Sequence, residues 1–374
     1  MKKILFLTGT RADFGKIKSL ISVLDTHKNF EVFVFVTGMH LQKEYGYTVI
    51  EIENCKFKNV HTFENHTHET TMDLTLAKTI EGFSSYCKTI SPDLIVVHGD
   101  RVETLAGAIV GSLNNILVAH IEGGEISGTV DELIRHSVSK LSHIHFVSNK
   151  EAGKRLLQMG EMESTIFTIG SPDIDIMFSN VLPTLETVKK YYQIDFDKFG
   201  IVMFHPVTTE VNEMKQYTTN FVEALLSDNK NYIVIYPNND LGSKYIIDSY
   251  QKLKNNTRFR IFPSLRFEYF LTLLKNAQFI IGNSSAGIRE APYYGIPIIN
   301  IGTRQLNRAV HADIINVDYS NEEIAKALQN ITNHQVQKTD TDFGSGNSAS
   351  LFLETLLDAN LWEINHQKQF LGLD

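Results

Sequence analysis

Twelve short apolar runs, six in each half of the chain, constrain the fold more than any other feature of the sequence. Most of them are apolar on both faces instead of alternating with polar residues, which is typical of parallel strands that helices cover on each side. Segments with apolar residues at three- and four-residue steps lie between the runs, as expected of those helices. The runs are KILFLTG, FEVFVFVTG, DLIVVHGD, ILVAHIEGG, HIHFVSN and STIFTIG in the first half, and GIVMFHP, YIVIYPN, FRIFPS, QFIIGN, IPIINIG and DIINVDYS in the second.

The length of the chain, 374 residues, favours two domains because it exceeds what one hydrophobic core comfortably serves. The sequence therefore predicts an α/β protein with two consecutive Rossmann-like domains, each built on a parallel sheet of about six strands. A polar stretch near residues 175–198 separates the two sets of runs. We expect a first domain over 1–178, a second over 179–354, and a C-terminal helix over 355–374 that returns to the first domain.

Charge and cysteine content exclude several classes of protein. The formal net charge of −8 argues against a nucleic-acid binder, which normally carries a basic face, but it allows an anionic small ligand held by a few arginines. The two cysteines, Cys55 and Cys87, lack metal-like spacing and fit a reducing cytoplasm. No apolar stretch approaches the ~20 residues needed to cross a bilayer, so we expect a cytoplasmic protein without membrane contact.

Functional side chains should follow the apolar runs, because ligands of doubly wound sheets bind outside the carboxyl ends of the strands. Two such domains facing one another would enclose a cleft lined by these ends. The stretch GNSSAGIREAPYYG, residues 282–295, is one example, and it predicts a strand that ends at Gly282 and a helix that runs on to Tyr294.

The start of that predicted helix suits a phosphate group. It offers unpaired backbone amides together with the hydroxyls of Ser284 and Ser285, and Glu290 can accept hydrogen bonds from a ribose diol. An ordinary capped helix whose small residues pack on the sheet explains the same residues equally well. Arg11, after the first run, can neutralise a phosphate or be a plain surface arginine. Neither a G-x-G-x-x-G nor a P-loop motif is present, so the dinucleotide and Walker fingerprints are missing.

Carboxylates also follow the runs of the first half. Asp100 and Glu122 come at two strand ends, and Asp131 lies near the start of the next helix. Carboxylates that converge at one sheet edge repel one another unless they are protonated, metal-bound or working on a substrate, and such clusters supply acid–base pairs. His120 and His205 add groups that titrate near neutrality. Simpler roles remain open: Asp131 can be a helix cap, and Asp100 can pair with the arginine that follows it.

Read together and in order, these motifs resemble the UDP-N-acetylglucosamine 2-epimerase family, and more narrowly its hydrolysing branch, which makes N-acetylmannosamine for bacterial sialic acids. The resemblance implies a glycosyltransferase-B-like fold with two domains facing a cleft, in agreement with the pattern of apolar runs. The motifs are GTRADFGK, TGMH, HGDRVETLAGA, HIEGGEISGTVDELIRHSVSKLSH, GSPDID, MFHPVTTE, YPNND, RFEYF, GNSSAGIREAPYYGIP and GTRQLNR.

The family resemblance implies a reaction. A base removes the proton at sugar C2 while UDP leaves from the opposite side, giving 2-acetamidoglucal; water then adds at C1 and a proton adds at C2 on the other face. It implies no cofactor and a homodimer or homotetramer, and no ligand set in the sequence demands a metal. It also implies roles for these residues: Asp100, Glu122, Asp131 and His205 as catalytic groups, and Arg11, Ser284, Ser285, Glu290 and Phe270 as the UDP site. We expect Glu122 to serve one face of C2, with Asp100 and Asp131 in hydration and reprotonation.

The sequence departs from the non-hydrolysing branch at four motifs. It has Ala12-Asp13 where that branch has Pro-Glu, Asn283 to Ala286 where it has Asp-Ser-Gly-Gly, Val130 to Glu132 where it has Pro-Glu-Glu, and Pro206-Val207 where it has arginines. These differences favour release of the free sugar over reversible interconversion of UDP-sugars.

Other functions remain open on the sequence alone. A close variant would act on a UDP-2,4-diacetamido-2,4,6-trideoxy sugar on the way to legionaminic acid, and the pocket that distinguishes the two cannot be identified from the sequence. A glycosyltransferase of the same fold would need an acceptor instead of water. A non-hydrolysing epimerase and a non-catalytic sensor of nucleotide sugars complete the alternatives, although a sensor gains nothing from crowded carboxylates.

Overall fold

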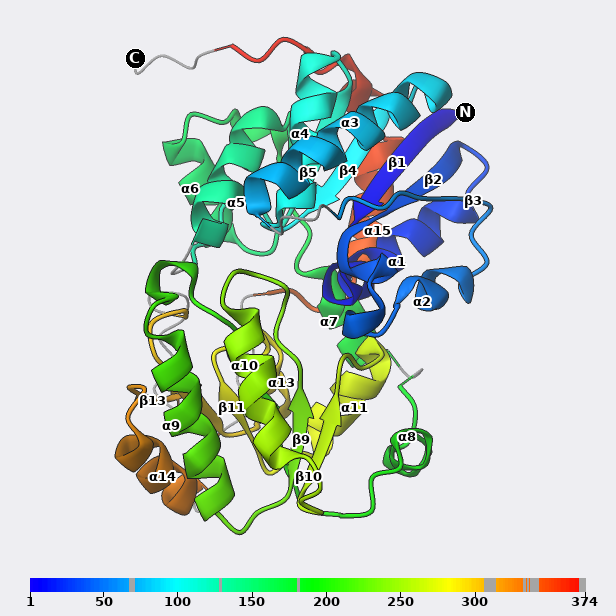
Figure 1. Ribbon diagram of the computed structural model, residues 1–374. Helices are drawn as coiled ribbons and strands as arrows, with labels where there is room; N and C mark the ends of the chain where they lie inside the picture. Colours follow the sequence, from blue (N-terminus) through cyan, green and yellow to red (C-terminus); the bar gives the residue numbers. More distant parts are fainter. Residues whose placement is uncertain are drawn as a thin grey trace. The chain divides into compact units, whose positions relative to one another are not determined.

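The computed structural model describes residues 1–66, 71–127, 130–179, 182–305, 314–331, 334, 336 and 343–369. The chain divides into two compact units (Figure 1). Unit 1 comprises Met1–Glu125, Asp131–Asn180 and Asp342–Asp374, and unit 2 comprises Ile126–Val130 and Val181–Thr341. Within the described residues, every helix is too short or too polar to cross a membrane.

Unit 1 is built on a parallel sheet of seven strands in the order β3-β2-β1-β4-β5-β6-β7. The order reverses between β1 and β4, as in doubly wound nucleotide-binding sheets. The strands are β1 (Lys2–Thr8), β2 (Phe30–Val36), β3 (Asn59–Thr62), β4 (Leu94–His98), β5 (Leu117–Ile121), β6 (Ile144–Val147) and β7 (Ile166–Thr168). The sequence predicts all of these except β3, which is a half-exposed edge strand with polar residues and therefore has no apolar run.

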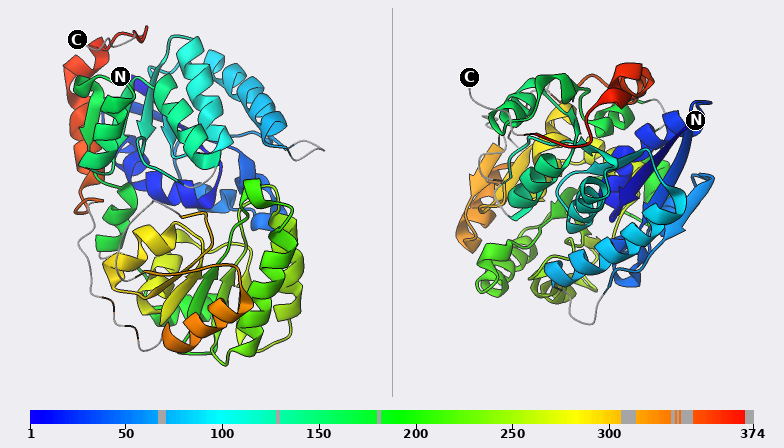
Figure 2. Two further views of the ribbon diagram at one scale, coloured as in Figure 1. Left: turned by 90° about the vertical axis from the view of Figure 1, so that its left-hand side faces the viewer. Right: turned by 90° about the horizontal axis from the view of Figure 1, so that it is seen from above.

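Helices cover both faces of this sheet (Figure 2). α1, α7 and α15 pack against one another, and α3 packs against α4. The helices of unit 1 are α1 (Arg11–Asp25), α2 (Val49–Glu53), α3 (Met72–Ile90), α4 (Val102–Leu113), α5 (Val130–Leu141), α6 (Lys150–Gln158), α7 (Pro172–Phe178) and α15 (Ser348–Leu357), with 3₁₀ turns at Gly38–Leu41, Lys43–Tyr45, Glu163–Thr165 and Ala359–Glu363.

Burial on both faces explains why the strands do not alternate apolar with polar residues. On one face of β1, Phe6 packs against Phe352 of α15, with ring centroids 6.3 Å apart. On the other face, α4 approaches so closely that a Cβ on Gly107 would lie 2.9 Å from Leu7. The central strand therefore has no solvent-facing side, as the sequence predicts.

The C-terminal helix returns to unit 1, as predicted, but it lies earlier in the chain than residues 355–374. α15 spans Ser348–Leu357 and contributes Phe352 to the core of unit 1. The helix ends because Asp358 takes an extended conformation and its carboxylate accepts the backbone N–H of Asn360 at 2.9 Å. The described chain beyond it is a 3₁₀ turn and coil that continue along unit 1.

Unit 2 is built on a parallel sheet of six strands in the order β10-β9-β8-β11-β12-β13, so it repeats the doubly wound arrangement with its reversal between β8 and β11. Its strands are β8 (Gly200–Met203), β9 (Tyr232–Ile235), β10 (Phe259–Phe262), β11 (Phe279–Gly282), β12 (Ile298–Ile301) and β13 (Ile314–Val317). The second set of apolar runs predicts all six.

Helices also enclose the sheet of unit 2. α9 packs against α10 and α14, and α11 packs against α8 and α13. The helices are α8 (Leu185–Tyr192), α9 (Met214–Ser227), α10 (Ser243–Tyr250), α11 (Phe267–Asn276), α12 (Ala286–Arg289), α13 (Ala291–Tyr294) and α14 (Asn321–Asn330), with 3₁₀ turns at Thr208–Glu210 and Gln251–Leu253.

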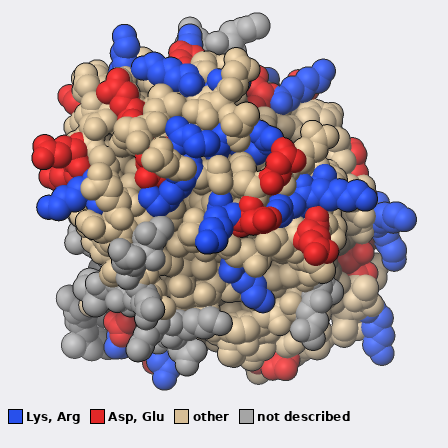
Figure 3. Space-filling model, turned by 90° about the horizontal axis from the view of Figure 1, so that it is seen from below, with Lys and Arg blue, Asp and Glu red and all other residues tan. Residues whose placement is uncertain are grey.

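The surface charge is mixed. On the face drawn in Figure 3, the coloured Lys and Arg side chains are interspersed with Asp and Glu side chains and do not merge into one basic surface. This mixture of both signs on the drawn face is in keeping with a formal net charge of −8.

Candidate active site

The first group of candidate residues lies at the carboxyl ends of the unit 1 strands. β1 and β4 are neighbours at the point where the strand order reverses, which is where doubly wound sheets bind their ligands. Arg11 follows β1 and Asp100 follows β4, so both predicted residues lie beside this point. Glu122 follows β5, the next strand along.

Glu122 has a strained backbone. Its φ of 62° is left-handed, a conformation that costs a non-glycine residue roughly 1–3 kcal/mol and that clusters at functional sites. Two hydrogen bonds hold it there: its N–H donates to the carbonyl of Phe146 at 2.8 Å, and its carbonyl accepts from Nη1 of Arg135 at 2.7 Å. The turn therefore presents the Glu122 side chain in a fixed direction.

Three polar side chains surround the buried carboxylate of Glu122. The Ser171 hydroxyl donates to Oε1, Nε2 of His98 lies 3.1 Å from Oε2, and Nζ of Lys16 lies 3.6 Å from the same oxygen. Lys16 also lies 3.1 Å from Oδ2 of Asp173, whose side chain is fully buried. The carboxylate is thus placed where it can exchange a proton while a cation stays beside it.

The sequence analysis did not select these surrounding residues. His98 is the last residue of β4 and stands two positions before Asp100, so its place at a strand end was a usable signal. Lys16 lies on α1, while Ser171 and Asp173 lie where α7 begins, and nothing in the local pattern distinguishes them from surface residues. Only the packing of α1 and α7 against each other brings them to Glu122.

Asp100 and Glu122 are brought together by Arg135. Its Nη2 donates to Oδ2 of Asp100, while its Nη1 holds the Glu122 carbonyl. Nε of Arg101, the residue after Asp100, lies 3.9 Å from Oε2 of Glu103. A buried guanidinium shared by two strand ends fixes the distance between them.

Asp131 lies in the first turn of α5 and is 9% exposed. It stands four residues before Arg135, so the two side chains occupy the same face of the helix. The three predicted acids of unit 1 are therefore linked through one residue: Asp100 and the Glu122 turn by hydrogen bonds to Arg135, and Asp131 by its position on the same helix.

His120 does not titrate near neutrality, contrary to the sequence prediction. It lies inside β5 and not at its end, and burial lowers its pKa to about 3. Its Nε2 lies 2.8 Å from the carbonyl of Gly99, and its Nδ1 lies 3.0 Å from Oγ of Ser139. A neutral imidazole must donate to the carbonyl, so Nδ1 accepts from the hydroxyl, and His120 is a structural crosslink.

Arg11 is the first residue of α1, and its Nη2 lies 3.3 Å from Oε1 of Glu51. The turn before it is held by Asp13, whose carboxylate accepts from the Thr8 hydroxyl and from the N–H groups of Gly9 and Thr10 at 3.0 and 3.1 Å. Burial raises the pKa of Asp13. The network fixes where the Arg11 helix starts.

The second group lies at the reversal point of the unit 2 sheet, between the ends of β8 and β11. The buried side chain of Asn283 joins the two ends: its Oδ1 accepts the N–H of His205 at 2.6 Å, and its Nδ2 donates to the His205 carbonyl at 2.9 Å. Nδ1 of His205 in turn accepts the N–H of Asn238 at 3.1 Å. This contact leaves the proton of a neutral His205 on Nε2, which makes Nε2 a hydrogen-bond donor.

Gly282 is required at the end of β11. Its φ is +136°, and a Cβ there would lie 2.0 Å from the carbonyl oxygen of Met203. Beyond it, the Asn283 carbonyl accepts from Nε2 of Gln305 at 2.8 Å and from Nη1 of Arg304 at 3.2 Å. The strand-to-helix turn is therefore held from both sides.

The predicted single helix from this turn to Tyr294 is wrong. Two four-residue helices, α12 and α13, meet at Glu290. A continuous helix would need Pro292 to donate an N–H to the carbonyl of Ile288, which proline cannot do. Ser285 stands at the N-cap position of α12 without a capping hydrogen bond from its side chain, and the Ser284 hydroxyl accepts the N–H of Ala286 at 3.3 Å. A single turn of helix also carries little macrodipole that could favour a phosphate.

Ser284 and Glu290 are buried, with exposures of 8% and 3%. Phe270 lies on α11 and is 7% exposed, and α11 packs against α13, the helix that follows Glu290. His205, Ser284, Ser285, Glu290 and Phe270 thus all belong to unit 2, whereas Arg11 belongs to unit 1.

Known proteins share this fold. The chain has a TM-score of 0.80 and 24% identity with the crystal structure of the UDP-GlcNAc 2-epimerase of Methanocaldococcus jannaschii in complex with UDP-GlcNAc and UDP, covering 95% of this chain and 99% of that one. Two parallel sheets of doubly wound order therefore match the glycosyltransferase-B-like fold predicted from the sequence.

Sequence comparisons identify the family. The chain is 48% identical to the UDP-N-acetylglucosamine 2-epimerase of Neisseria meningitidis serogroup B over the full length of both. It is 34% identical to the UDP-N,N'-diacetylbacillosamine 2-epimerase (hydrolyzing) of Legionella pneumophila, over 93% of this chain and 94% of that protein. The family described as UDP-N-acetylglucosamine 2-epimerase matches residues 22–357, and the chain belongs to this family.

Proposed function

We propose that the chain hydrolyses UDP-N-acetylglucosamine with inversion at C2, giving N-acetylmannosamine and UDP for bacterial sialic acid synthesis. The observation that carries the proposal is the buried Glu122 carboxylate, held on a strained backbone beside His98 and Lys16. A carboxylate fixed in this way can remove a proton from carbon, because it does not have to be ordered or desolvated during the reaction.

In the first step, Glu122 takes the proton at C2, the C1–O bond to UDP breaks, and the electron pair forms the C1=C2 bond of 2-acetamidoglucal. His98, 3.1 Å from Oε2, can pass that proton on. In the second step, water adds at C1 and C2 receives a proton on the opposite face. Asp100 and Asp131 supply the base for the water and the acid for C2, with Arg135 fixing Asp100.

The nucleotide is assigned to the residues of unit 2 and to Arg11. Ser284 and Ser285 donate to the diphosphate, Glu290 accepts from the ribose and Phe270 lies at the uracil. Nε2–H of His205, aimed by the Asn238 contact to Nδ1, donates to the phosphate of the leaving group and so stabilises the charge that develops as UDP departs.

Three further assignments belong to the proposal. The reaction uses no cofactor and no metal, since proton transfers and loss of a phosphate leaving group need only acids, bases and donors. The protein acts in the cytoplasm, where UDP-sugars are made, and it assembles as a homodimer or homotetramer like the family to which it belongs.

UDP-N-acetylglucosamine is favoured over the 2,4-diacetamido-6-deoxy sugar because the chain is 48% identical to the Neisseria relative named for the first substrate and 34% identical to the Legionella relative named for the second. The second substrate is the alternative, because both relatives extend over nearly the whole chain.

Incubation of the protein with each UDP-sugar in deuterated water tests the proposal. We expect UDP and free N-acetylmannosamine carrying deuterium at C2, identified by NMR, from UDP-N-acetylglucosamine without any acceptor. Conversion of only the diacetamido sugar would move the assignment to the alternative. UDP release that requires an acceptor, or product without deuterium at C2, would refute the elimination mechanism.

A further inference from the structure

One face of α5 carries side chains, spread along the length of the helix, that include a proposed acid or contact the turns of the others. Asp131, Arg135 and Ser139 follow one another at four-residue steps, so they lie in a row along the helix. Arg135 holds Asp100 and the Glu122 turn by hydrogen bonds. Any shift of α5 along its axis, or any rotation about it, would therefore move Asp131. It would also move Arg135, which fixes the spacing of the other two proposed acids.

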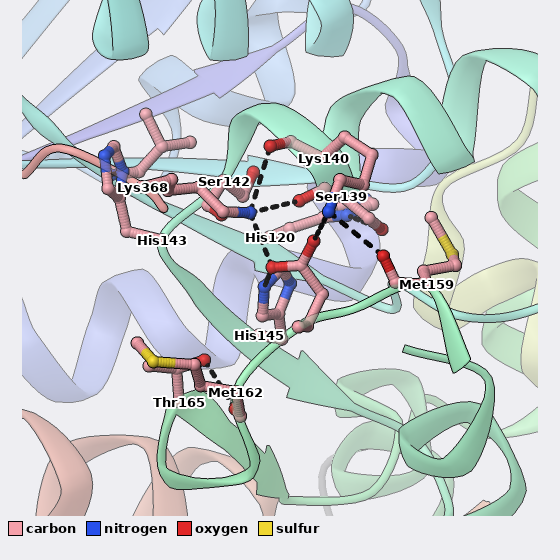
Figure 4. Close-up of polar contacts among 12 residues, drawn as sticks. His120, Ser139, Lys140, Ser142, His143, His145, Met159, Met162, Thr165 and Lys368 are labelled. Atoms are coloured by element: carbon pink, nitrogen blue, oxygen red, sulfur yellow. Dashed lines mark hydrogen bonds and ion pairs between the residues drawn. The ribbon is translucent and has the colours of Figure 1, made fainter. Parts of the chain in front are cut away.

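The C-terminal end of α5 is fastened by a lysine from the far end of the chain (Figure 4). Nζ of Lys368 donates to the carbonyls of Ser139, Lys140 and Ser142 at 3.4, 3.0 and 2.7 Å, and lies 2.5 Å from Oε2 of Glu161. The last carbonyls of a helix have no partner within the helix, and a cation is favourable there. One ammonium group thus closes the end of α5 and ties it to the turn before β7.

Glu161 is the buried carboxylate that anchors Lys368. It is 1% exposed, and besides Lys368 it contacts Nε2 of His145 at 2.9 Å and Nζ of Lys140 at 2.8 Å. Although burial alone would raise the pKa of Glu161, the hydrogen bonds from His145 and the two lysines lower it to about 2. The carboxylate is an anion at neutral pH, so Lys368 has a permanent counter-charge.

A second connection runs from the same end of α5 to the acids. The Ser139 hydroxyl donates to His120, and His120 donates to the carbonyl of Gly99, the residue before Asp100. The Ser139–His120 pair also packs directly against the turn that contains Glu122. The contact with Gly123 is so close that a Cβ there would lie 2.8 Å from Nδ1 of His120 and 2.9 Å from Oγ of Ser139. The end of α5 that Lys368 holds is therefore in contact with the backbones of both strand-end turns.

We propose that Lys368 is a positioning residue of the active site, which acts by fixing the C-terminal end of α5 and, through it, Arg135, Asp131 and the Ser139–His120 pair. The proposal rests on the acid–base roles proposed above for Asp100, Glu122 and Asp131. The distance from Ser139 to Asp131 along a helix is about 12 Å, so the effect is transmitted by one rigid element and needs no conformational switch.

The Lys368→Met variant of the full-length protein tests the proposal. Displacement of a catalytic group by about 1 Å can cost up to ~100-fold in rate, so we expect kcat for UDP-N-acetylglucosamine to fall roughly 10- to 100-fold. KM and the inhibition constant for UDP should stay within about twofold of the wild type, because the proposed nucleotide site lies on other elements. Lys368→Arg keeps a donor of fixed positive charge and should restore most of kcat.

Lys140→Met is the matched control. The Lys140 side chain contacts the same carboxylate, at 2.8 Å, but donates to the carbonyl of Met159 and to no carbonyl of α5. This variant should lower the melting temperature less than Lys368→Met, because Lys140 is more exposed and makes fewer contacts, and it should leave kcat near the wild-type value. The contrast separates loss of positive charge near Glu161 from loss of the helix-end contacts.

Wild-type kcat in folded Lys368→Met would overturn the proposal, and so would a change confined to KM. If that variant cannot be purified folded, Ser139→Ala tests the same connection, with a fall in kcat at unchanged KM expected and normal kcat overturning it. Failure of the proposed function looks different, because the wild-type protein would then release no UDP from UDP-N-acetylglucosamine, and failure of the acid–base roles would leave Asp100→Asn with wild-type kcat. Normal kcat in Lys368→Met together with an inactive Asp100→Asn refutes only the positioning role.

Discussion

The two sheets have the same strand order, yet their reversal points are built from different chemistry. In unit 1, charged groups join the strand ends, as when Arg135 bridges Asp100 and the Glu122 turn. In unit 2, a neutral amide joins them, because Asn283 holds His205 by two hydrogen bonds. Paired charges suit proton transfer, while neutral donors that carry no counter-anion suit a bound phosphate. One scaffold used twice can thus divide acid–base chemistry from anion binding.

The largest effect expected from this division is loss of turnover when a unit 1 carboxylate is neutralised. Asp100→Asn and Glu122→Gln should each lower kcat by about 10²–10⁴-fold, the usual contribution of a general acid or base. The inhibition constant for UDP should hardly change. Steady-state kinetics with UDP-N-acetylglucosamine measures both. Glu151→Gln, on the exposed start of α6, is the control. Weaker UDP inhibition in the unit 1 variants would contradict the division.

The next effect concerns acid stability, which should differ between the units. Burial lowers the pKa values of His40 and His120, both in unit 1, to about 3. The folded values lie below the unfolded value, so the unfolded state binds more protons and stability falls as pH drops from about 6.5 toward 3. By pH 5 each histidine should have cost roughly 2 kcal/mol of unfolding free energy. Asp13, whose pKa burial raises, offsets part of this loss.

Three buried tyrosines of unit 2 have the opposite pH dependence. Burial raises the pKa values of Tyr232, Tyr250 and Tyr319, so their stabilisation is complete below about pH 10 and is lost only above it. Hydrogen exchange by mass spectrometry should therefore show β4 and β5 opening before β8 and β9 on acidification. Equal or reversed loss of protection would show that these histidines do not control acid stability.

A moderate effect is expected when the neutral link of unit 2 is removed. Asn283→Ala leaves the N–H and carbonyl of His205 without their partners, and buried groups in that state cost about 1–3 kcal/mol. Because the same residue aligns His205 and Ser284, we expect the inhibition constant for UDP to rise by roughly tenfold or more. kcat should fall less than in Asp100→Asn. The reverse ranking would assign His205 to the acid–base chemistry of unit 1.

The sequence predicts the scaffold well, because buried parallel strands are apolar at every position and their ends are marked by polar residues. It predicts Asp100 and Glu122 at strand ends for the same reason. The prediction that His120 titrates near neutrality is wrong, because the sequence does not distinguish a histidine buried within a strand from one exposed at the end of that strand. The sequence does not indicate Lys16 and Ser171 either, because only the packing of α1 and α7 brings them to Glu122.

The predicted helix after β11 shows a different limit. Pro292 was present in the sequence, but proline is tolerated in the first turn of a helix, and Pro292 stands in the first turn of α13. The start of α14 is another case. Ser320 and Glu323 have the spacing of a capping box, which would predict mutual caps. Instead, Ser320 precedes the helix without a side-chain cap, and Oε2 of Glu323 accepts the N–H of Asp318 at 3.0 Å. Local patterns predict that a helix forms, whereas tertiary contacts decide its ends.

The smallest expected effect concerns how tightly the interior of each unit is packed. A matched pair of helical glycines, one in each unit, tests it. A Cβ on Gly153 of α6, in unit 1, would lie 3.5 Å from Cγ2 of Ile166, an ordinary contact, whereas a Cβ on Gly287 of α12, in unit 2, would lie 3.3 Å from Cγ2 of Ile298. Gly153→Ala should therefore stabilise the fold by about 0.5–1 kcal/mol, because alanine loses less backbone entropy on folding.

Gly287→Ala should gain less than Gly153→Ala or lose stability, since Ile298 must give way and the turn that carries Ser284 must move with α12. Urea unfolding with hydrogen exchange resolved by unit measures both changes. If Gly287→Ala stabilises as much as Gly153→Ala and leaves UDP inhibition unchanged, the turn after β11 is more tolerant than its contacts indicate. The rigid placement of Ser284 by Gly282 and Asn283 would then have to be abandoned as the reason for the nucleotide binding that we propose for unit 2.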